Sequence, residues 1–121
     1  MRIRSADAWL DAWAMIDTGA AVNLFDAELA SSPGLKQSSV TRRLSILGIS
    51  GAAHRIPFWK VEIWILPWQF GYRASVEVGF VPRLGSSVGN VLGREFLELI
   101  HFGLDQSQRT LYLGRAARSP R

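Results

Sequence analysis

The chain has 121 residues, a length that fits one domain, and its composition of 48% hydrophobic and 20% charged residues is that of a folded globular protein rather than a disordered one. Cysteine is absent, which excludes disulfides, thiolate nucleophiles and cysteine-ligated zinc. The two histidines, His54 and His101, lie far apart in the sequence, so we expect no metal site and no cofactor.

The net charge is +4, from 14 Lys and Arg against 10 Asp and Glu. The basic residues are scattered, and Arg42 and Arg43 form the only adjacent pair, so we do not expect nucleic acid as a partner. No apolar run reaches the roughly 20 residues of a membrane span. Asp7 and Asp11 interrupt the apolar stretch that a secretory signal would need, so the default expectation is a cytoplasmic location.

The first predicted element is a strand over residues 8–16, which is apolar on both faces and should therefore be buried. This strand ends directly before Asp17. A short helix is predicted over residues 26–30, because Asp26 can cap its first turn. The Ser-Ser-Pro-Gly sequence that follows should end this helix.

The middle of the chain alternates apolar and polar residues with a period of two, which is typical of half-buried strands. In residues 55–66, for example, Trp59, Val61 and Ile63 share one face. Another predicted strand begins at Val40 and runs into Gly48. Further strands are predicted over residues 72–81, 90–92 and 110–113, and a second helix over residues 94–100. Together they indicate a mostly-β, barrel-like domain over residues 1–114 with a basic, mobile tail over residues 115–121.

The sharpest chemical signal is Asp17, which follows three apolar residues and precedes Thr18, Gly19 and Ala20. A carboxylate at the edge of a hydrophobic core needs a hydrogen-bond partner or a chemical task. An Asp-Thr-Gly sequence also fits an ordinary turn in which the carboxylate binds its own backbone. The motif taken alone therefore leaves a structural and a catalytic role open.

Two further motifs lie downstream of Asp17. Leu92-Gly93-Arg94 joins an apolar strand to the second predicted helix, and Gly93 lacks a Cβ atom, so another backbone segment can pass close to it. Between this motif and Asp17, the glycines Gly48 and Gly51 permit the tight turn of a hairpin tip. Each motif by itself also fits an ordinary turn.

In this order and spacing, the motifs resemble those of retropepsin-like aspartic proteases of the single-lobe, homodimeric type, over roughly residues 14–113. The resemblance implies a closed acid-protease barrel, whose closing strands are similar to residues 102–113. It implies that Asp17 is catalytic and that a glycine-bearing hairpin, the flap, binds substrate. By position, the implied site residues are Thr18, Gly19 and Ala20 in the active-site loop, Gly48, Ile49, Ser50 and Gly51 in the flap, and Leu92, Gly93 and Arg94 as structural residues near the site.

The activity implied by the resemblance is that of an aspartic endopeptidase, a hydrolase that needs two adjacent aspartates sharing one proton. Of the five aspartates in the chain, only Asp17 is followed by Thr-Gly or Ser-Gly, so one chain supplies half of the site. We therefore expect a homodimer that places Asp17 beside its own copy. The expected substrate is an extended peptide or protein.

Two departures from the family favour an alternative. The family often has an acidic residue four positions after the catalytic aspartate, where it pairs with the arginine of Gly-Arg, but this chain has Ala21 there. The 16 residues before Asp17 are also few for the family. The alternative is a catalytically weak or inactive dimerisation or peptide-binding module with the same fold.

Two other functions are less well supported by the sequence. A phosphohydrolase with Asp17 as nucleophile would need a second acidic residue nearby for magnesium and a lysine that grips phosphate, and Asp17 has neither as a sequence neighbour. A basic β-barrel that binds nucleic acid would need clustered rather than scattered positive charge.

Overall fold

The computed structural model describes residues 1–5, 9–32, 35–47, 53–65, 72–82, 84 and 89–115, and it is mostly β, as predicted. Its helical elements are a 3-10 helix, η1 (Ala27–Ser31), and a short α-helix, α1 (Arg94–Leu97). Its strands are β1 (Arg2–Arg4), β2 (Leu10–Asp11), β3 (Ala14–Ile16), β4 (Asn23–Asp26), β5 (Val40–Leu47), β6 (Ala53–Ile65), β7 (Tyr72–Val81), β8 (Asn90–Leu92), β9 (Ile100–Asp105) and β10 (Thr110–Arg115).

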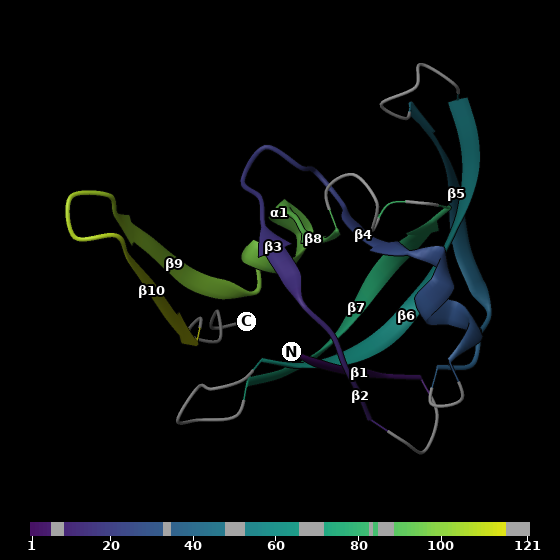
Figure 1. Ribbon diagram of the computed structural model, residues 1–121, viewed down its shortest axis with the longest axis horizontal. Coiled ribbons are helices and arrows are strands. Elements are labelled where there is room, and N and C mark those ends of the chain that lie inside the picture. Colours follow the sequence, from purple (N-terminus) through teal and green to yellow (C-terminus); the bar gives the residue numbers. More distant parts are fainter. Residues whose placement is uncertain are drawn as a thin grey trace, which may run out of the picture.

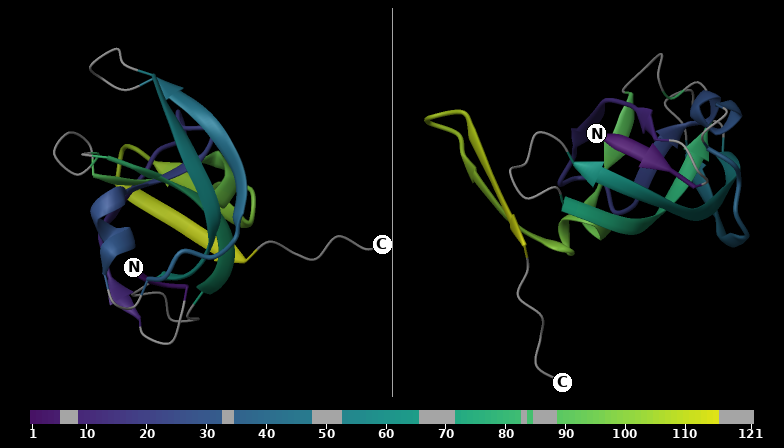
Figure 2. Two further views of the ribbon diagram at one scale, coloured as in Figure 1. Left: turned by 90° about the vertical axis from the view of Figure 1, so that its right-hand side faces the viewer. Right: turned by 90° about the horizontal axis from the view of Figure 1, so that it is seen from below.

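Eight of the strands form one curled sheet, seen in Figure 1, whose order is β2-β1-β6-β7-β4-β8-β3, with β5 paired to β6 beside this path. The long strands β5, β6 and β7 are antiparallel neighbours. Among the residues that the structure describes, β9 and β10 pair only with each other, and they form a hairpin that projects from the sheet (Figures 1 and 2). None of the helices among the described residues is long and apolar enough to span a membrane.

The period-two alternation predicted for β6 and β7 is confirmed. Trp59, Val61 and Ile63 are buried on one face of β6, whereas Lys60 between them is exposed. The Trp59 ring stacks on Phe80 from β7 with ring centroids 4.3 Å apart. The core cluster includes residues of β1, β4, β6, β7, β8, β9 and α1. Its buried members are Ile3, Phe25, Leu35, Trp59, Val61, Ile63, Val76, Val78, Phe80, Leu92, Phe96 and Ile100.

The apolar stretch over residues 8–16 is not one buried strand, so this prediction is wrong. Its two halves belong to opposite ends of the sheet, because β2 pairs with β1 and β3 pairs with β8. Ala12 lies at the break and exchanges two 2.9 Å hydrogen bonds with Met1, and Trp13 after it is exposed. Pairing with the N-terminus divides the stretch, and hydropathy does not reveal such long-range pairing. Only the end of the predicted strand, directly before Asp17, is as expected.

The two predicted helices are present with changes. Asp26 caps η1 as predicted, because one of its carboxylate oxygens accepts a 2.8 Å hydrogen bond from the Glu28 N–H, although the helix is of the 3-10 type. The helix α1 ends at Leu97, earlier than predicted, because Ile100 already pairs with Arg115 in the β9–β10 hairpin. The competing strand pairing shortens the helix.

The turn of the β9–β10 hairpin is built around Asp105. Its carboxylate accepts hydrogen bonds from the Ser107 hydroxyl at 2.7 Å and from the Gln108 N–H at 3.2 Å, and these bonds hold the pKa of Asp105 below its ordinary value. Arg115, which was predicted to begin the tail, belongs to β10 instead. The rest of that tail, residues 116–121, lies outside the described residues.

Candidate active site

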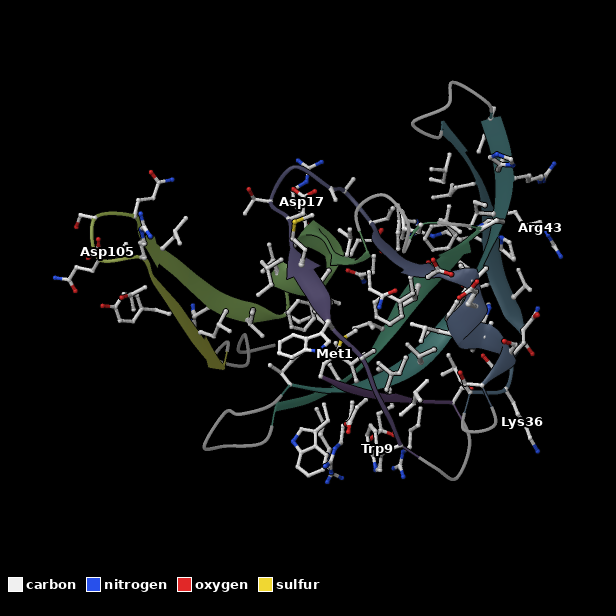
Figure 3. All side chains as sticks on the ribbon, viewed as in Figure 1. Met1, Trp9, Asp17, Lys36, Arg43 and Asp105 are labelled. Atoms are coloured by element: carbon white, nitrogen blue, oxygen red, sulfur yellow. The ribbon has the colours of Figure 1, made fainter. Side chains whose placement is uncertain are left out.

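Asp17 is the first residue after β3 and begins the loop that leads to β4 (Figure 3). Its backbone N–H donates a 3.0 Å hydrogen bond to the Leu92 carbonyl, which extends the pairing of β3 with β8 by one residue. One oxygen of its half-buried carboxylate accepts a 2.8 Å hydrogen bond from the Gly19 N–H. Thr18 and Gly19 at the turn of this loop are exposed. The loop therefore holds one carboxylate in a defined position near the surface.

The loop is anchored by β8, a strand from far downstream that lies between the two strands the loop connects. β8 is parallel to β3 and antiparallel to β4. The side chain of Asn90 at the start of β8 donates a 2.8 Å hydrogen bond to the Trp13 carbonyl and accepts one of 2.8 Å from the Asp26 N–H. Asn90 thus fixes the chain on both sides of the Asp17 loop, a role that our sequence reasoning missed.

A second backbone segment passes close to Gly93, as the sequence predicts. A Cβ atom at Gly93 would lie 2.7 Å from the Ala20 carbonyl oxygen and closer still to that of Val22. The next residue, Arg94, donates its backbone N–H to the Ala20 carbonyl at 2.8 Å, and Glu95 donates to the next carbonyl along the loop at 3.3 Å. The segment after β8 therefore braces the Asp17 loop through backbone contacts that only glycine at position 93 permits.

Asn23 is the buried polar residue of this region, with an exposed fraction of 1%. Its side-chain oxygen accepts a 2.9 Å hydrogen bond from the Gly93 N–H, and its amide group donates one of 3.1 Å to the Glu77 carbonyl. A buried amide needs partners of this kind, and here they connect β4 and β7 to the brace at Gly93. A lone asparagine among apolar residues could have been noticed in the sequence, but its partners could not.

Arg42 on β5 connects its strand to α1 and β7. One of its guanidinium nitrogens, Nη2, donates to both carboxylate oxygens of Glu95 on α1, at 2.6 and 2.8 Å, and its Nε forms an ion pair with Glu77 on β7. The hydrogen bonds to Glu95, together with the charges of both glutamates, raise the pKa of Arg42 above its ordinary value. The sequence showed Arg42 only as a strand residue, because both partners are distant in the chain.

Replacing Arg42 with glutamine should lower the free energy of unfolding by about 1–2 kcal/mol, because two neighbouring carboxylates lose their shared cation at a partly exposed site. Urea denaturation measures this loss. Arg43→Gln is the matched control, since Arg43 is exposed and its side chain forms no ion pair within the described part of the chain. It should change stability by no more than about 0.5 kcal/mol. Equal losses in both variants would show that the Arg42 contacts do not matter.

The predicted flap falls where β5 and β6 form an antiparallel hairpin, whose last described pair is Leu47 with Ala53. Gly48, Ile49, Ser50 and Gly51 lie outside the described residues, so the flap and its substrate contacts stay predictions.

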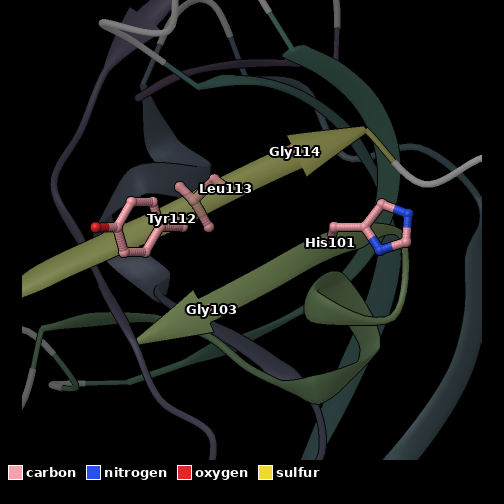
Figure 4. Close-up of a pocket in the computed structure, with 5 residues that line it drawn as sticks. All are labelled: His101, Gly103, Tyr112, Leu113 and Gly114. Carbon is pink, nitrogen blue, oxygen red and sulfur yellow. The ribbon is translucent and has the colours of Figure 1, made fainter. Parts of the chain in front are cut away.

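The side chain of Arg94 is exposed, and within the described residues it forms no ion pair. Ala21, which occupies the family's acidic position, is exposed as well. No cluster of three or more His, Asp or Glu side chains suited to a metal ion occurs among the residues that the structure describes. A shallow hollow lined by His101, Gly103, Tyr112, Leu113 and Gly114 lies on the β9–β10 hairpin rather than at the Asp17 loop (Figure 4).

Comparisons of the chain with protein-family models, with curated proteins and with solved structures found no match. The argument for a function therefore depends on the motifs in the sequence and on the geometry of the Asp17 loop.

Proposed function

We propose that this protein is an aspartic endopeptidase of the retropepsin-like type, in which Asp17 from each of two subunits activates a water molecule. The observation that carries the proposal is the braced loop. Asp17 is held at the end of β3 by the Gly19 N–H and the Leu92 carbonyl, and the segment from Gly93 onward supports the loop from behind. Such bracing keeps a catalytic group in one position, which efficient chemistry requires.

Two carboxylates in contact cannot both ionise easily, so they share one proton. In the proposed reaction the ionised carboxylate, acting as general base, takes a proton from a water molecule that attacks the scissile carbonyl carbon. The protonated carboxylate donates a hydrogen bond to the carbonyl oxygen. The tetrahedral intermediate then collapses with cleavage of the C–N bond, and the carboxyl pair returns the proton taken from water to the leaving amine nitrogen. The proposal includes the closed barrel of the family and a flap that covers an extended peptide.

One chain offers one Asp17, so the second carboxylate must come from another copy of the chain. An isologous two-fold dimer supplies it, because such a dimer places the same surface of both subunits in contact. The exposure of Thr18 and Gly19 supports this arrangement, since it leaves the loop accessible to a partner.

A peptide-binding or dimerisation module without hydrolytic activity is the second candidate. It is favoured by the surroundings of Arg94, whose side chain is exposed and has no carboxylate partner within the described residues, because the loop carries Ala21. In this case the braced loop would shape a binding surface rather than hold a catalytic pair.

The two candidates differ in how they respond to a pepstatin-like mimic of the transition state, which binds a catalytic pair far more tightly than substrate does. We expect the protein to cleave members of a broad peptide library, and we expect titration of that activity to end at one inhibitor for every two chains. A titration that ends at one inhibitor per chain would contradict the half-site. Peptides that bind but are never cleaved would favour the inactive module.

A further inference from the structure

An arginine–tryptophan cluster lies on the face of the sheet that is turned away from the core. Its members are Arg2 and Arg4 on β1, Trp9 directly before β2, Trp64 on β6 and Arg73 on β7. The strand register places Arg2, Trp64 and Arg73 opposite one another across three strands. Because the neighbouring Ile63 is buried, Trp64 belongs to the outer face. Trp9 and Asp17 lie at opposite ends of the molecule, so the cluster is separate from the candidate active site (Figure 3).

The two indole rings of the cluster hold the arginine side chains in place. The centroids of the Trp9 and Trp64 rings are 5.8 Å apart. The guanidinium carbon of Arg73 lies 4.4 Å from the Trp64 centroid, and that of Arg4 lies 4.3 Å from the Trp9 centroid, which are cation–π distances. A guanidinium that lies against a ring keeps the N–H groups around its edge available. Arg73 is therefore an oriented set of hydrogen-bond donors.

One of the three arginines has no anionic partner within the described part of the chain. The Nε atom of Arg2 donates to Asp11 at 3.0 Å, and the Nε atom of Arg4 donates to Glu62 at 3.0 Å. Arg73 is exposed and forms no ion pair with a described residue. Three guanidinium groups and two carboxylates leave one positive charge, which Arg73 carries. The cluster thus contains two arginine–carboxylate pairs and a position for a third.

The composition of the cluster favours a carboxylate over other anions. The bases of a nucleic acid would need free indole faces for stacking, but guanidinium groups already lie against both rings. A phosphate carries up to two negative charges, and the carboxylates of Asp11 and Glu62 would repel it. A carboxylate carries one charge, as Arg73 does, and its two oxygens fit the paired N–H groups of a guanidinium.

The strand that carries Arg73 also has an edge to which another strand can add. Over residues 72–76, β7 pairs with β6 on one side. On its other side β4 reaches β7 only at residues 78–81, so no described strand pairs with residues 72–76 there. An extended peptide can add to such an edge through backbone hydrogen bonds, and every second side chain of that peptide then lies on the face of Arg73.

We propose that the arginine–tryptophan cluster and the adjoining edge of β7 form a docking site for an extended, acidic segment of a partner protein. The segment adds beside residues 72–76 and gives the carboxylate of a glutamate or an aspartate to Arg73. The indole rings orient Arg73 before the partner arrives, so little side-chain freedom is lost on binding. The docking site is independent of the proposed function, because neither Asp17 nor a second copy of the chain takes part in it.

The docking site is tested with a peptide of alternating glutamate and valine, capped at both ends so that the glutamates are its only charges. By calorimetry it should bind the Asp17→Asn protein, which lacks the proposed catalytic carboxylate. The same peptide with glutamine in place of glutamate should bind at least about 10-fold more weakly. Failure of the acidic peptide to bind, or equal affinity for both peptides, would overturn the proposal. Tighter binding of inorganic phosphate or of single-stranded oligothymidine would do so as well.

Arg73→Gln should weaken binding of the acidic peptide about 10-fold or more, because the peptide carboxylate loses its charged partner. Arg43→Gln is the matched control: it removes the same charge at another exposed arginine, which lies far from Trp9 (Figure 3), and should leave the affinity unchanged. Circular dichroism checks that both variants are folded. Equal affinities in the two folded variants would show that Arg73 does not receive the peptide.

A second measurement keeps every arginine and does not depend on how the Arg73 variant folds. The indole N–H signals of Trp9 and Trp64 in nuclear magnetic resonance spectra, assigned with Trp9→Phe and Trp64→Phe, should shift when the acidic peptide is added. The glutamine peptide at the same concentration should shift them much less. Shifts confined to the signals of other tryptophans would place the peptide elsewhere and overturn the proposal.

Discussion

Asp17→Asn should abolish peptide cleavage while leaving the fold and the dimer intact. Asparagine has nearly the same size and keeps a side-chain oxygen that can accept the Gly19 N–H, so the loop should be preserved. It can neither take a proton from water nor share one with a neighbour. Because the substitution removes both members of the pair, initial rates should fall by more than the roughly 100- to 10,000-fold that a single general acid or base contributes.

Asp11→Asn is the matched control for this loss. It makes the same chemical change at an exposed residue whose partner is Arg2, and activity should stay near that of the wild type. A variant at position 17 that cleaves as well as this control would show that the catalyst lies elsewhere.

Mixing the two proteins tests whether the site is shared. After subunit exchange in an equal mixture of wild type and Asp17→Asn, about one quarter of the dimers contain two aspartates by random pairing. Activity per wild-type chain should therefore fall to about half of its value in the unmixed protein. Independent sites in each chain would leave this activity unchanged.

Gly93→Ala should cause the largest loss of stability, about 3 kcal/mol or more in the free energy of unfolding. The added methyl group would lie 2.7 Å from the Ala20 carbonyl oxygen and closer to that of Val22. Both neighbours are backbone atoms in the Asp17 loop, so neither can rotate away as a side chain would. The loop must move away from its brace, and we expect activity to fall together with stability.

Gly114→Ala is the control for this substitution, because its methyl group would make an ordinary 3.7 Å contact with the His101 Cβ. Urea denaturation of both variants measures the difference. A Gly93→Ala protein with an unchanged denaturation midpoint would mean that the two segments are not in close contact in solution.

Local sequence patterns determined much of this fold. The alternation of residues in β6 and β7 predicted both strands and their buried faces, because each residue of a strand faces the side opposite to its neighbours. The cap at Asp26 and the turn at Asp105 were also predictable, since their hydrogen bonds reach only two or three residues along the chain. Asp17 stood out for the same local reason, as a carboxylate directly after an apolar strand.

The tertiary structure decided what depends on contacts between distant residues. The anchors of the Asp17 loop, Asn23 and Asn90, bind partners that lie 54 to 77 residues away. Arg42 and Glu95, which also bind each other, are 53 residues apart. The sequence did not reveal that Trp13 is exposed, because only pairing with the N-terminus divides the predicted strand over residues 8–16. Hydropathy and turn propensity report the preferences of neighbouring residues. Which distant strand fills the gap beside β3, and which apolar residues stay at the surface, is determined only when the whole sheet packs.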